Sequence, residues 1–404
     1  MTTSLPYPWS DRMLAHLRVF CKQIGPRPSA SEKERRAAEY VKKTLRGLGI
    51  EEISEQAFNS PTSLGWLILP CLAAVVISNP LVLIYYGWPG KVLGILLTFS
   101  SALILRQILV ARMPFYKGLL PMGVSQNIIA RIRSTSQSAQ KIFLVGHLDT
   151  QKERRLFPPS DTRRLPLYAT ALVLFPVFTG LLYLLDIFLK ISEVGWWDVL
   201  AVVINVMILW GFIQDERRSY VEGANDNASA ASLLLTTAEV LIEKPLQNSE
   251  VTLVFTGCEE VGNVGMKHYL KLFKPPKEGS YWIDLEMVGT GGLCYVTRHG
   301  LTPLGSYKPS PEMLALTKKT AQGCPELGVT GKDMIILEEV ILLRRGGYRA
   351  VCLAGYNEQG HLPNWHRQAD QLENIQPESL QRAAQFTWAL LNEIDRLAKP
   401  DEVL

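Results

Sequence analysis

Two stretches of the chain are nearly free of charged residues, and they dominate its hydrophobic pattern. In the first stretch, residues 64–88 carry no charge and residues 92–111 carry only Arg106. Because a helix of about 20 apolar residues is long enough to cross the hydrocarbon core of a bilayer, each run predicts a transmembrane helix. A short turn at Pro89-Gly90-Lys91 completes the first predicted helical hairpin, residues 62–112.

The second stretch repeats this pattern. Residues 165–185 are uncharged, Lys190 to Asp198 form a connection, and residues 199–214 are again uncharged. The tryptophans at the start of the last run are typical of a membrane interface. This stretch therefore predicts a second transmembrane hairpin, residues 165–214.

Two charged residues accompany the apolar runs, and their positions decide how they are interpreted. Arg106 lies toward one end of its hairpin and Asp186 toward the opposite end of the other. Long side chains near helix ends reach the bilayer surface. This arrangement favours side chains that reach the headgroups over an intramembrane ion pair.

The rest of the chain has the size of one globular domain. Residues 1–61, 113–164 and 215–404 remain when the hairpins are removed, and two spans in each hairpin keep these pieces on one side of the bilayer. Only Lys91 and Lys190 lie in the hairpin turns. By the positive-inside rule, the sequence predicts a multi-pass membrane protein with this domain in the cytoplasm. The basic residues on the domain side of the helices are Arg112, Lys117, Lys152, Arg154, Arg155, Arg163, Arg164, Arg217 and Arg218.

Helical and strand patterns alternate in the domain. Ser31 and Glu34 form a capping box, and apolar residues at helical spacing follow up to Gly49. Alternation of strands and helices predicts an α/β fold, a mixed central sheet flanked by helices, with ligands at the strand ends. The predicted strands are 127–132, 142–145, 251–255, 281–288 and 349–353, and the further helices are 229–241 and 377–397.

Composition narrows the possible partners. Lysine and arginine total 42 against 38 acidic residues, and this net charge of +4 predicts no nucleic-acid partner. Hydrophobic residues make up 47% of the chain, which excludes a disordered protein. The six cysteines form no CxxC pair, and the first residues show no export pattern, so we expect reduced thiols and no cleaved signal.

Candidate metal ligands follow three of the predicted elements. His147 and Asp149 come directly after a strand, where the carboxylate is placed to orient the imidazole. Asp226 lies in the loop GANDNASA before a helix. Glu259 and Glu260 follow the strand VTLVF, so one can bind a metal while the other acts as a base. Each segment alone also fits a helix cap or surface charge.

Two further segments add donors. Asp284 and Glu286 lie on one face of an apolar strand, where buried acids require a cation, and His366 lies in the loop NWHRQAD. Histidine nitrogens and carboxylate oxygens together suit zinc. The five segments jointly predict a site for one or two zinc ions.

These motifs resemble those of the co-catalytic di-zinc exopeptidases, a family that includes secreted bacterial aminopeptidases and glutamate carboxypeptidase. The matching segments are GHLDT, GANDNASA, GCEEVGNVG, IDLEMVG and HRQADQLENI, together with the amino-terminal IGPRPSASEKERRAAEYVKKTLRGLGI. The resemblance covers nearly all 303 residues outside the hairpins. It implies a zinc exopeptidase fold and hydrolysis of peptide bonds, with an aminopeptidase as the leading hypothesis.

The resemblance also implies a role for each motif residue. His147 and Glu286 would bind one zinc ion, Glu260 and His366 the other, and Asp226 would bridge the two. Glu259 would be the general base that activates water and then protonates the leaving amine, and Asp149 would orient His147. The resemblance thus implies two catalytic residues, Glu259 and Asp149, and five metal ligands, His147, Asp226, Glu260, Glu286 and His366.

The sequence departs from the family pattern in three places. Asp284 and Glu286 replace the usual Asn and Asp of the IDLEMVG motif, so Asp284 is an alternative ligand. Trp365 stands where relatives often have an oxyanion-stabilising tyrosine. The second hairpin separates His147 from the Asp226 motif, and we infer that the active site lies close to the bilayer.

Several hypotheses about function remain open. The leading hypothesis is an exopeptidase with a peptide or amide substrate. The first alternative is an amidohydrolase that acts on a lipid-linked or non-peptide amide, and the second is a membrane scaffold that has lost catalysis. The lipid bilayer is an expected partner. The hairpins either anchor the enzyme, bind a membrane protein partner, or bring the cleft to membrane-associated substrates.

Overall fold

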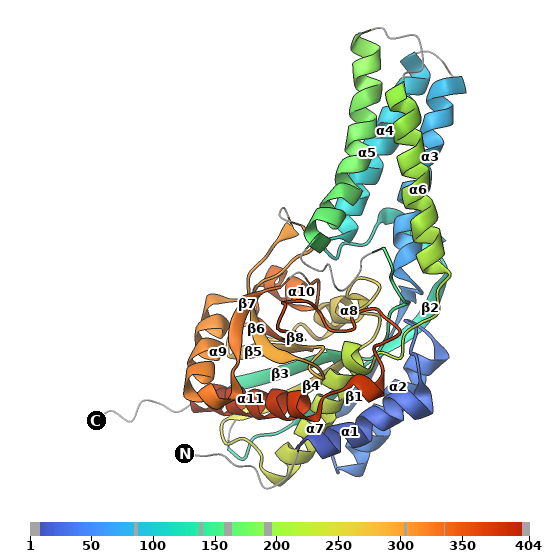
Figure 1. The fold of residues 1–404 in the computed structure, drawn as a ribbon. Helices are drawn as coiled ribbons and strands as arrows, with labels where there is room; N and C mark the ends of the chain where they lie inside the picture. The colour runs from blue at the N-terminus through green and yellow to red at the C-terminus, as the bar shows by residue number, and fades with distance from the viewer. Residues whose placement is uncertain are drawn as a thin grey trace.

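The protein is a three-layer α/β domain from which four long helices project on one side (Figure 1). The computed structural model describes residues 9–84, 88–136, 140–156, 164–189, 196–302, 305–334 and 336–397. Most of the predicted connection from Lys190 to Asp198, and Arg163, lie outside these described residues. The α/β class with a mixed sheet flanked by helices is confirmed.

The central sheet has the order β1-β2-β4-β3-β5-β8-β6-β7. Its four inner strands, β4, β3, β5 and β8, run parallel, whereas β2 and β6 pair antiparallel to their inner neighbours. The carboxyl ends of the parallel strands therefore meet at one edge of the sheet. The strands are β1 Ile53–Pro61, β2 Met122–Ile132, β3 Gln140–His147, β4 Ser249–Thr256, β5 Ser280–Glu286, β6 Gly292–Arg298, β7 Thr330–Asp333 and β8 Arg349–Tyr356.

Helices cover both faces of the sheet, as the alternation along β3 requires. Ile142 and Leu144 point into the larger core, while Phe143 and Val145 point into the smaller one on the opposite face. The larger core lies under α1 Trp9–Arg18, α2 Glu32–Gly47, α7 Ser229–Glu243, α9 Pro311–Gly323 and α11 Pro377–Arg396, and the smaller one under α8 Val264–Phe273 and α10 Val340–Arg345.

The predicted strands and helices of the domain all occur, but the strands β1, β6 and β7 were not predicted. Strands β1 and β7 lie at the two edges of the sheet and are mostly polar, so they lack the apolar run on which the prediction depended. Ser31 caps α2 as predicted, because it accepts a hydrogen bond from the Glu34 amide, but the Glu34 carboxylate accepts the amide of Ala30 instead of that of Ser31.

Four helices are long and apolar enough to cross a membrane. They are α3 Leu64–Ile84, α4 Trp88–Ile108, α5 Leu165–Phe188 and α6 Trp196–Glu216. The prediction of a turn at Pro89-Gly90-Lys91 is wrong, since these residues form the first turn of α4. A proline costs little there because the first amide groups of a helix have no intrahelical acceptor.

Arg106 and Asp186 do not form an ion pair with each other. Arg106 is exposed near the domain end of α4. Asp186 lies instead at the far end of the helices, where its carboxylate is 4.0 Å from the Lys91 ammonium. The interpretation of the two residues as unrelated charges at opposite ends agrees with these positions.

An ionic network joins the helices to the domain. The buried Glu216 carboxylate, at the end of α6, accepts from Lys152 at 2.7 Å and Arg154 at 3.1 Å, and it also accepts from the hydroxyl of Ser63 just before α3. Beside it, Asp215 accepts the amides of residues 155 and 156. The ends of α3 and α6 are thereby fixed to the loop that follows β3.

Arg27 connects the chain on both sides of the second hairpin. Its fully buried guanidinium donates to the carbonyl of Leu148, before the hairpin, at 2.7 Å. It also donates to the carbonyls of Glu222 and Gly223, after the hairpin, at 3.0 and 2.9 Å. Gly223 has a φ of 66°, and a Cβ there would lie 2.2 Å from Thr150, so only glycine fits this close approach.

We predict that Arg27→Met destabilises the domain strongly. Several buried carbonyls lose their donor at once, and breaking a buried charged network costs about 3–5 kcal/mol. Thermal unfolding of the detergent-purified protein measures the effect, with Arg36→Met as a control because Arg36 is exposed on α2. Equal unfolding temperatures for the two variants would contradict the role assigned to Arg27.

Candidate metal centre

The predicted site residues meet at the carboxyl edge of the parallel strands. His147 is the last residue of β3 and Glu286 the last of β5, while Glu259 and Glu260 follow β4. Asp226 lies in the loop before α7, and His366 lies in the loop after β8. The carboxyl ends of the parallel strands and the adjoining loops thus bring donors from five separate segments into one place.

These donors form two groups that share one carboxylate. The Nε2 atom of His147 lies 3.2 Å from Asp226 Oδ1 and 3.7 Å from Glu286 Oε2. The Nε2 atom of His366 lies 3.4 Å from Asp226 Oδ2 and 3.3 Å from Glu260 Oε2. Each oxygen of Asp226 therefore faces a different histidine, which is the arrangement of a carboxylate that bridges two cations.

The spacing of the donors fits a metal better than hydrogen bonds. Donor atoms around a tetrahedral zinc with bonds of about 2.0–2.1 Å lie roughly 3.3 Å apart, close to the distances at His147 and His366. A separation of 3.7 Å, as between His147 and Glu286, is too long for a hydrogen bond. One oxygen each of Glu260 and Glu286 is buried without a hydrogen-bond partner. Nitrogen and oxygen donors with free lone pairs suit zinc.

The electrostatics of the site also favour a cation. Burial alone would lower the pKa of His366, but Glu260 and Asp226 outweigh it and raise this pKa to about 9. Burial raises the pKa of Glu286 to about 8 and raises that of Glu260. Without a metal, burial thus favours protonated carboxyl groups, and the neighbouring carboxylates favour a protonated imidazole. A bound cation would replace these protons.

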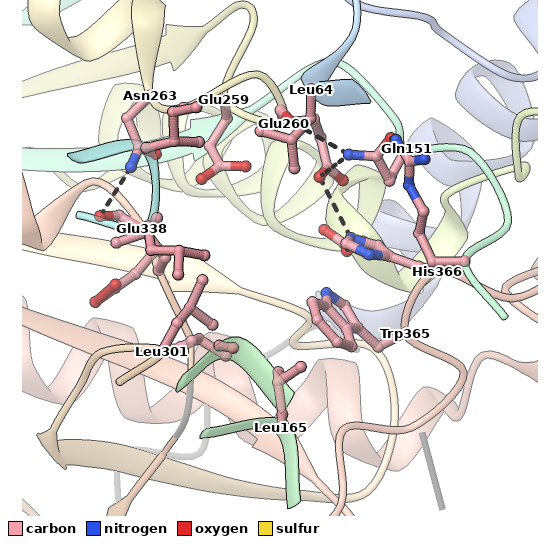
Figure 2. Close-up of a pocket in the computed structure, with 18 of the residues that line it drawn as sticks. Leu64, Gln151, Leu165, Glu259, Glu260, Asn263, Leu301, Glu338, Trp365 and His366 are labelled. Carbon is pink, nitrogen blue, oxygen red and sulfur yellow. Dashed lines mark hydrogen bonds and ion pairs between the residues drawn. The ribbon is translucent and has the colours of Figure 1, made fainter. Parts of the chain in front are cut away.

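Glu259 lies beside the donor groups of His147 and His366, but it is not one of the donors arranged around Asp226. Its Oε2 atom is 3.9 Å from His147 Nε2, and its side chain faces the cavity next to Glu260 (Figure 2). Burial raises the pKa of Glu259 well above its usual range. A carboxylate with a raised pKa, close to the candidate metal donors, is suited to accept a proton.

Asp149 contacts more of the site than His147 alone. The Nδ1 atom of His147 lies 3.4 Å from the Asp149 carboxylate and makes its hydrogen bond with the Asp149 carbonyl at 3.1 Å. The carboxylate accepts the amides of Glu259 and Glu260 at 3.0 and 3.1 Å, and the Ser29 hydroxyl at 2.6 Å. It therefore positions the two-glutamate loop as well as the imidazole.

Three supporting residues were not found from the sequence. Gln151 donates to Glu260 at 3.1 Å, and Asn227 donates to Glu286 at 3.1 Å. Asp370 accepts the amides of Asn225 and Asp226 at 2.6 and 3.1 Å. Such contacts orient metal ligands, but amide and acid residues in loops carry no periodic signal that identifies them.

A second group of buried acids lies behind the ligands. Asp284 is fully buried, and burial holds its pKa well above the usual range. It faces Glu338 and Glu339 rather than His147, so Glu286 is the acid of this motif that joins the histidine. Glu339 accepts from Thr256 at 2.6 Å, and Glu338 pairs with His299. The pair Glu338-Glu339 was missed because it looks like an exposed helix start.

Trp365 lines the same cavity. Its ring stacks on that of His366 with centroids 4.1 Å apart, and both side chains face the cavity (Figure 2). The position expected for an oxyanion-stabilising group thus carries an indole, which can donate one hydrogen bond. This places the replacement residue beside a candidate ligand.

Comparisons with known proteins define the class. Residues 197–391 match the sequence model of peptidase family M28. Over 70 residues the chain is 39% identical to Aminopeptidase YwaD of Bacillus subtilis (strain 168), a match that covers 17% of this chain and only 15% of that protein. His147 and Asp149 lie before the residues that the family model matches.

Solved structures extend the comparison over nearly the whole chain. The zinc aminopeptidase BSAP from Bacillus subtilis has a TM-score of 0.57 at 14% identity, covering 95% of both chains. A glutaminyl cyclase from Bacteroides thetaiotaomicron, bound to N-acetylhistamine, has a TM-score of 0.56 at 13% identity, covering 95% of this chain and 97% of that one. The family match and the shared fold together identify the chain as a metallo-exopeptidase. Residues 197–391 thus have the sequence pattern of peptidase family M28, which confirms the resemblance found in the motifs.

We predict that metal removal makes the stability depend more strongly on pH. In the metal-free protein the folded-state pKa of Glu286, about 8, lies above its usual 4.5. A raised folded-state pKa contributes stability at low pH, and this contribution is lost as the pH rises toward 8. The difference in unfolding temperature between zinc-loaded and chelator-treated protein should therefore be larger at pH 8 than at pH 5.5.

Differential scanning fluorimetry at both pH values measures this difference. The variant Glu286→Gln provides a control, because it lacks the titrating carboxyl and should lose part of the pH dependence when metal-free. Parallel unfolding curves with and without chelator would show that these donors hold no cation.

Proposed function

We propose that the protein is a membrane-anchored exopeptidase with two zinc ions, most simply an aminopeptidase. The observation that carries this proposal is the Asp226 carboxylate, which presents one oxygen to His147 and the other to His366, with Glu259 alongside. His147 and Glu286 would hold one ion, and Glu260 and His366 the other. The zinc aminopeptidases among the similar structures support this substrate class.

The residues of the chain divide the reaction between them. Zinc ions, when bound, polarise the substrate carbonyl and acidify water. Glu259 takes the proton from the attacking water and returns it to the leaving amine, since its carboxylate faces the cavity beside the histidine and carboxylate donors. Asp149 keeps the loop of Glu259 and Glu260 in place through their amides.

Four apolar helices support the anchoring in a membrane. The basic residues on the domain side of these helices outnumber those in the hairpin turns, which supports a cytoplasmic position of the catalytic domain. Both chain ends of each hairpin join the same domain, as an even number of spans requires. We therefore propose a four-span protein with its metal centre on the cytoplasmic side.

We predict that Glu259→Gln lowers kcat by about 10²–10⁴-fold while zinc is retained. Release of amino acids from a panel of unblocked peptides measures activity, and elemental analysis measures zinc, expected at two ions per chain. Glu278→Gln is the matched control, since Glu278 is exposed in the same domain. Full activity of Glu259→Gln would exclude it as the base.

The panel also separates the alternative functions. Because glutaminyl cyclases are among the similar structures, it includes a peptide with an amino-terminal glutamine, whose cyclisation is detected by loss of ammonia. Turnover of acyl amides alone would favour an amidohydrolase. A protein that binds no zinc and turns over no substrate would support a scaffold.

We predict that the hairpin turns and the domain react on opposite sides of the membrane. Single cysteines at Trp88, which is 71% exposed, and at the exposed Glu278 test this in a Cys324→Ser background. A membrane-impermeant maleimide added to intact cells should label Trp88→Cys but label Glu278→Cys only after lysis. Labelling of Glu278→Cys in intact cells would reverse the orientation.

A further inference from the structure

The cavity at the metal centre has one polar end and a much larger apolar wall. Glu259, Glu260 and the two histidines form the polar end. The opposite wall includes Leu165, and Leu301 lies near it (Figure 2). All four apolar helices contribute to this wall, through Leu64 and Ile68 of α3, Ile108 of α4, Leu165 and Leu172 of α5, and Phe212 of α6.

These wall residues lie at the domain ends of the helices. Leu64 begins α3, Ile108 ends α4, and Leu165 begins α5, whereas Phe212 lies in the last turns of α6. If the helices cross a bilayer, these turns lie where the acyl chains of the near leaflet begin. The cavity therefore runs from the metal donors to the edge of the hydrocarbon region.

Helices α5 and α6 both line the cavity at this level. Helices α5 and α6 diverge toward the domain (Figure 1), and they pack only weakly on each other, in contrast to the close packing of α4 on both α3 and α5. Ala169 lines the cavity from α5, and Phe212 and Asp215 line it from α6. The cavity is thus lined by two helices that pack only weakly on each other.

We propose that the substrate is an amphiphile, a peptide or amide whose carbonyl lies at the metal donors and whose alkyl chain occupies the apolar cavity between the four helices. This inference rests on the proposed function, because it names the substrate class of the same site. Apolar side chains from membrane helices, rather than polar loops, form the wall opposite the base, and such a wall recognises methylene groups.

The size of the expected preference follows from burial of methylene groups. Each methylene moved from water into an apolar wall favours binding on the order of fourfold. A series of leucine amides with N-alkyl chains of zero, four, eight and twelve carbons measures it, with the protein in lipid nanodiscs. The value of kcat/KM should rise at least tenfold from the unsubstituted amide to the longest chain that the cavity holds.

Two neighbouring positions on α5 provide a matched pair of variants. Ala169 is 3% exposed and lines the cavity, while Leu167 is 63% exposed on the outer face of the same helix. Ala169→Phe fills the cavity and should bring the kcat/KM ratio of the long-chain to the unsubstituted amide close to one. Leu167→Phe should leave this ratio as in the unaltered protein. Leu165→Gln, which adds no bulk, should also lower the ratio and guards against misfolding of the first variant.

A labelling experiment tests the cavity without any turnover. An N-alkyl leucine amide with a photoreactive group at the end of its chain is irradiated with Glu259→Gln protein in nanodiscs, and the labelled peptides are mapped by mass spectrometry. Saturable labelling of Leu64, Ile68, Ala169 or Leu172, competed by excess unlabelled long-chain amide, is expected. Labelling confined to outward positions such as Leu167 or Leu174, without competition, would overturn the inference.

The outcomes separate the two levels of the argument. Equal kcat/KM values along the series, with turnover retained, would leave the peptidase function standing and refute the alkyl-chain cavity. Absence of turnover on every amide would refute the proposed function, and the labelling experiment would then decide the cavity by itself.

Discussion

The guanidinium of Arg27 makes this active site possible. His147 and Asp226 must lie 3.2 Å apart although a pair of apolar helices separates them along the chain. Arg27, from the amino-terminal segment, donates to carbonyls on both sides of that insertion and is fully buried between them. Closing so long an excursion costs conformational entropy that grows only slowly with its length, so a few strong buried contacts suffice to hold the two ends together.

The donors that this contact brings together form a site that is incomplete without cations. Several buried carboxylates face two imidazoles, and burial makes their ionised forms costly. Asp226 is the exception, since both histidines hold its pKa below the usual range. The shared carboxylate thus stays ionised while its neighbours favour the protonated form. A charge distribution of this kind favours metal binding, and Glu259, whose pKa burial also raises, lies directly beside the candidate ligands.

The sequence predicted the parts of the structure that local pattern determines. His147, Glu260 and Glu286 were found because each ends or follows an apolar strand, and a parallel sheet collects such ends at one edge. Strands β1 and β7 were missed because edge strands need no apolar face on both sides. Gln151 was missed because its contact is with Glu260, which is distant in the sequence. Glu338 was missed for the same reason, since its partner is His299. A local hydrophobic period contains no information about such distant contacts.

The helices and the metal donors are linked by a short series of contacts. Glu216, at the end of α6, accepts from Arg154, which donates to Gln151, and Gln151 donates to the candidate ligand Glu260. Arg154 also holds the loop of the other ligand through the carbonyl of His366. A displacement of α6 must therefore change the support of Glu260 and His366. Since the ends of the same helices form the apolar wall of the cavity, the position of the helical pairs affects both the shape of this cavity and the contacts that support Glu260 and His366.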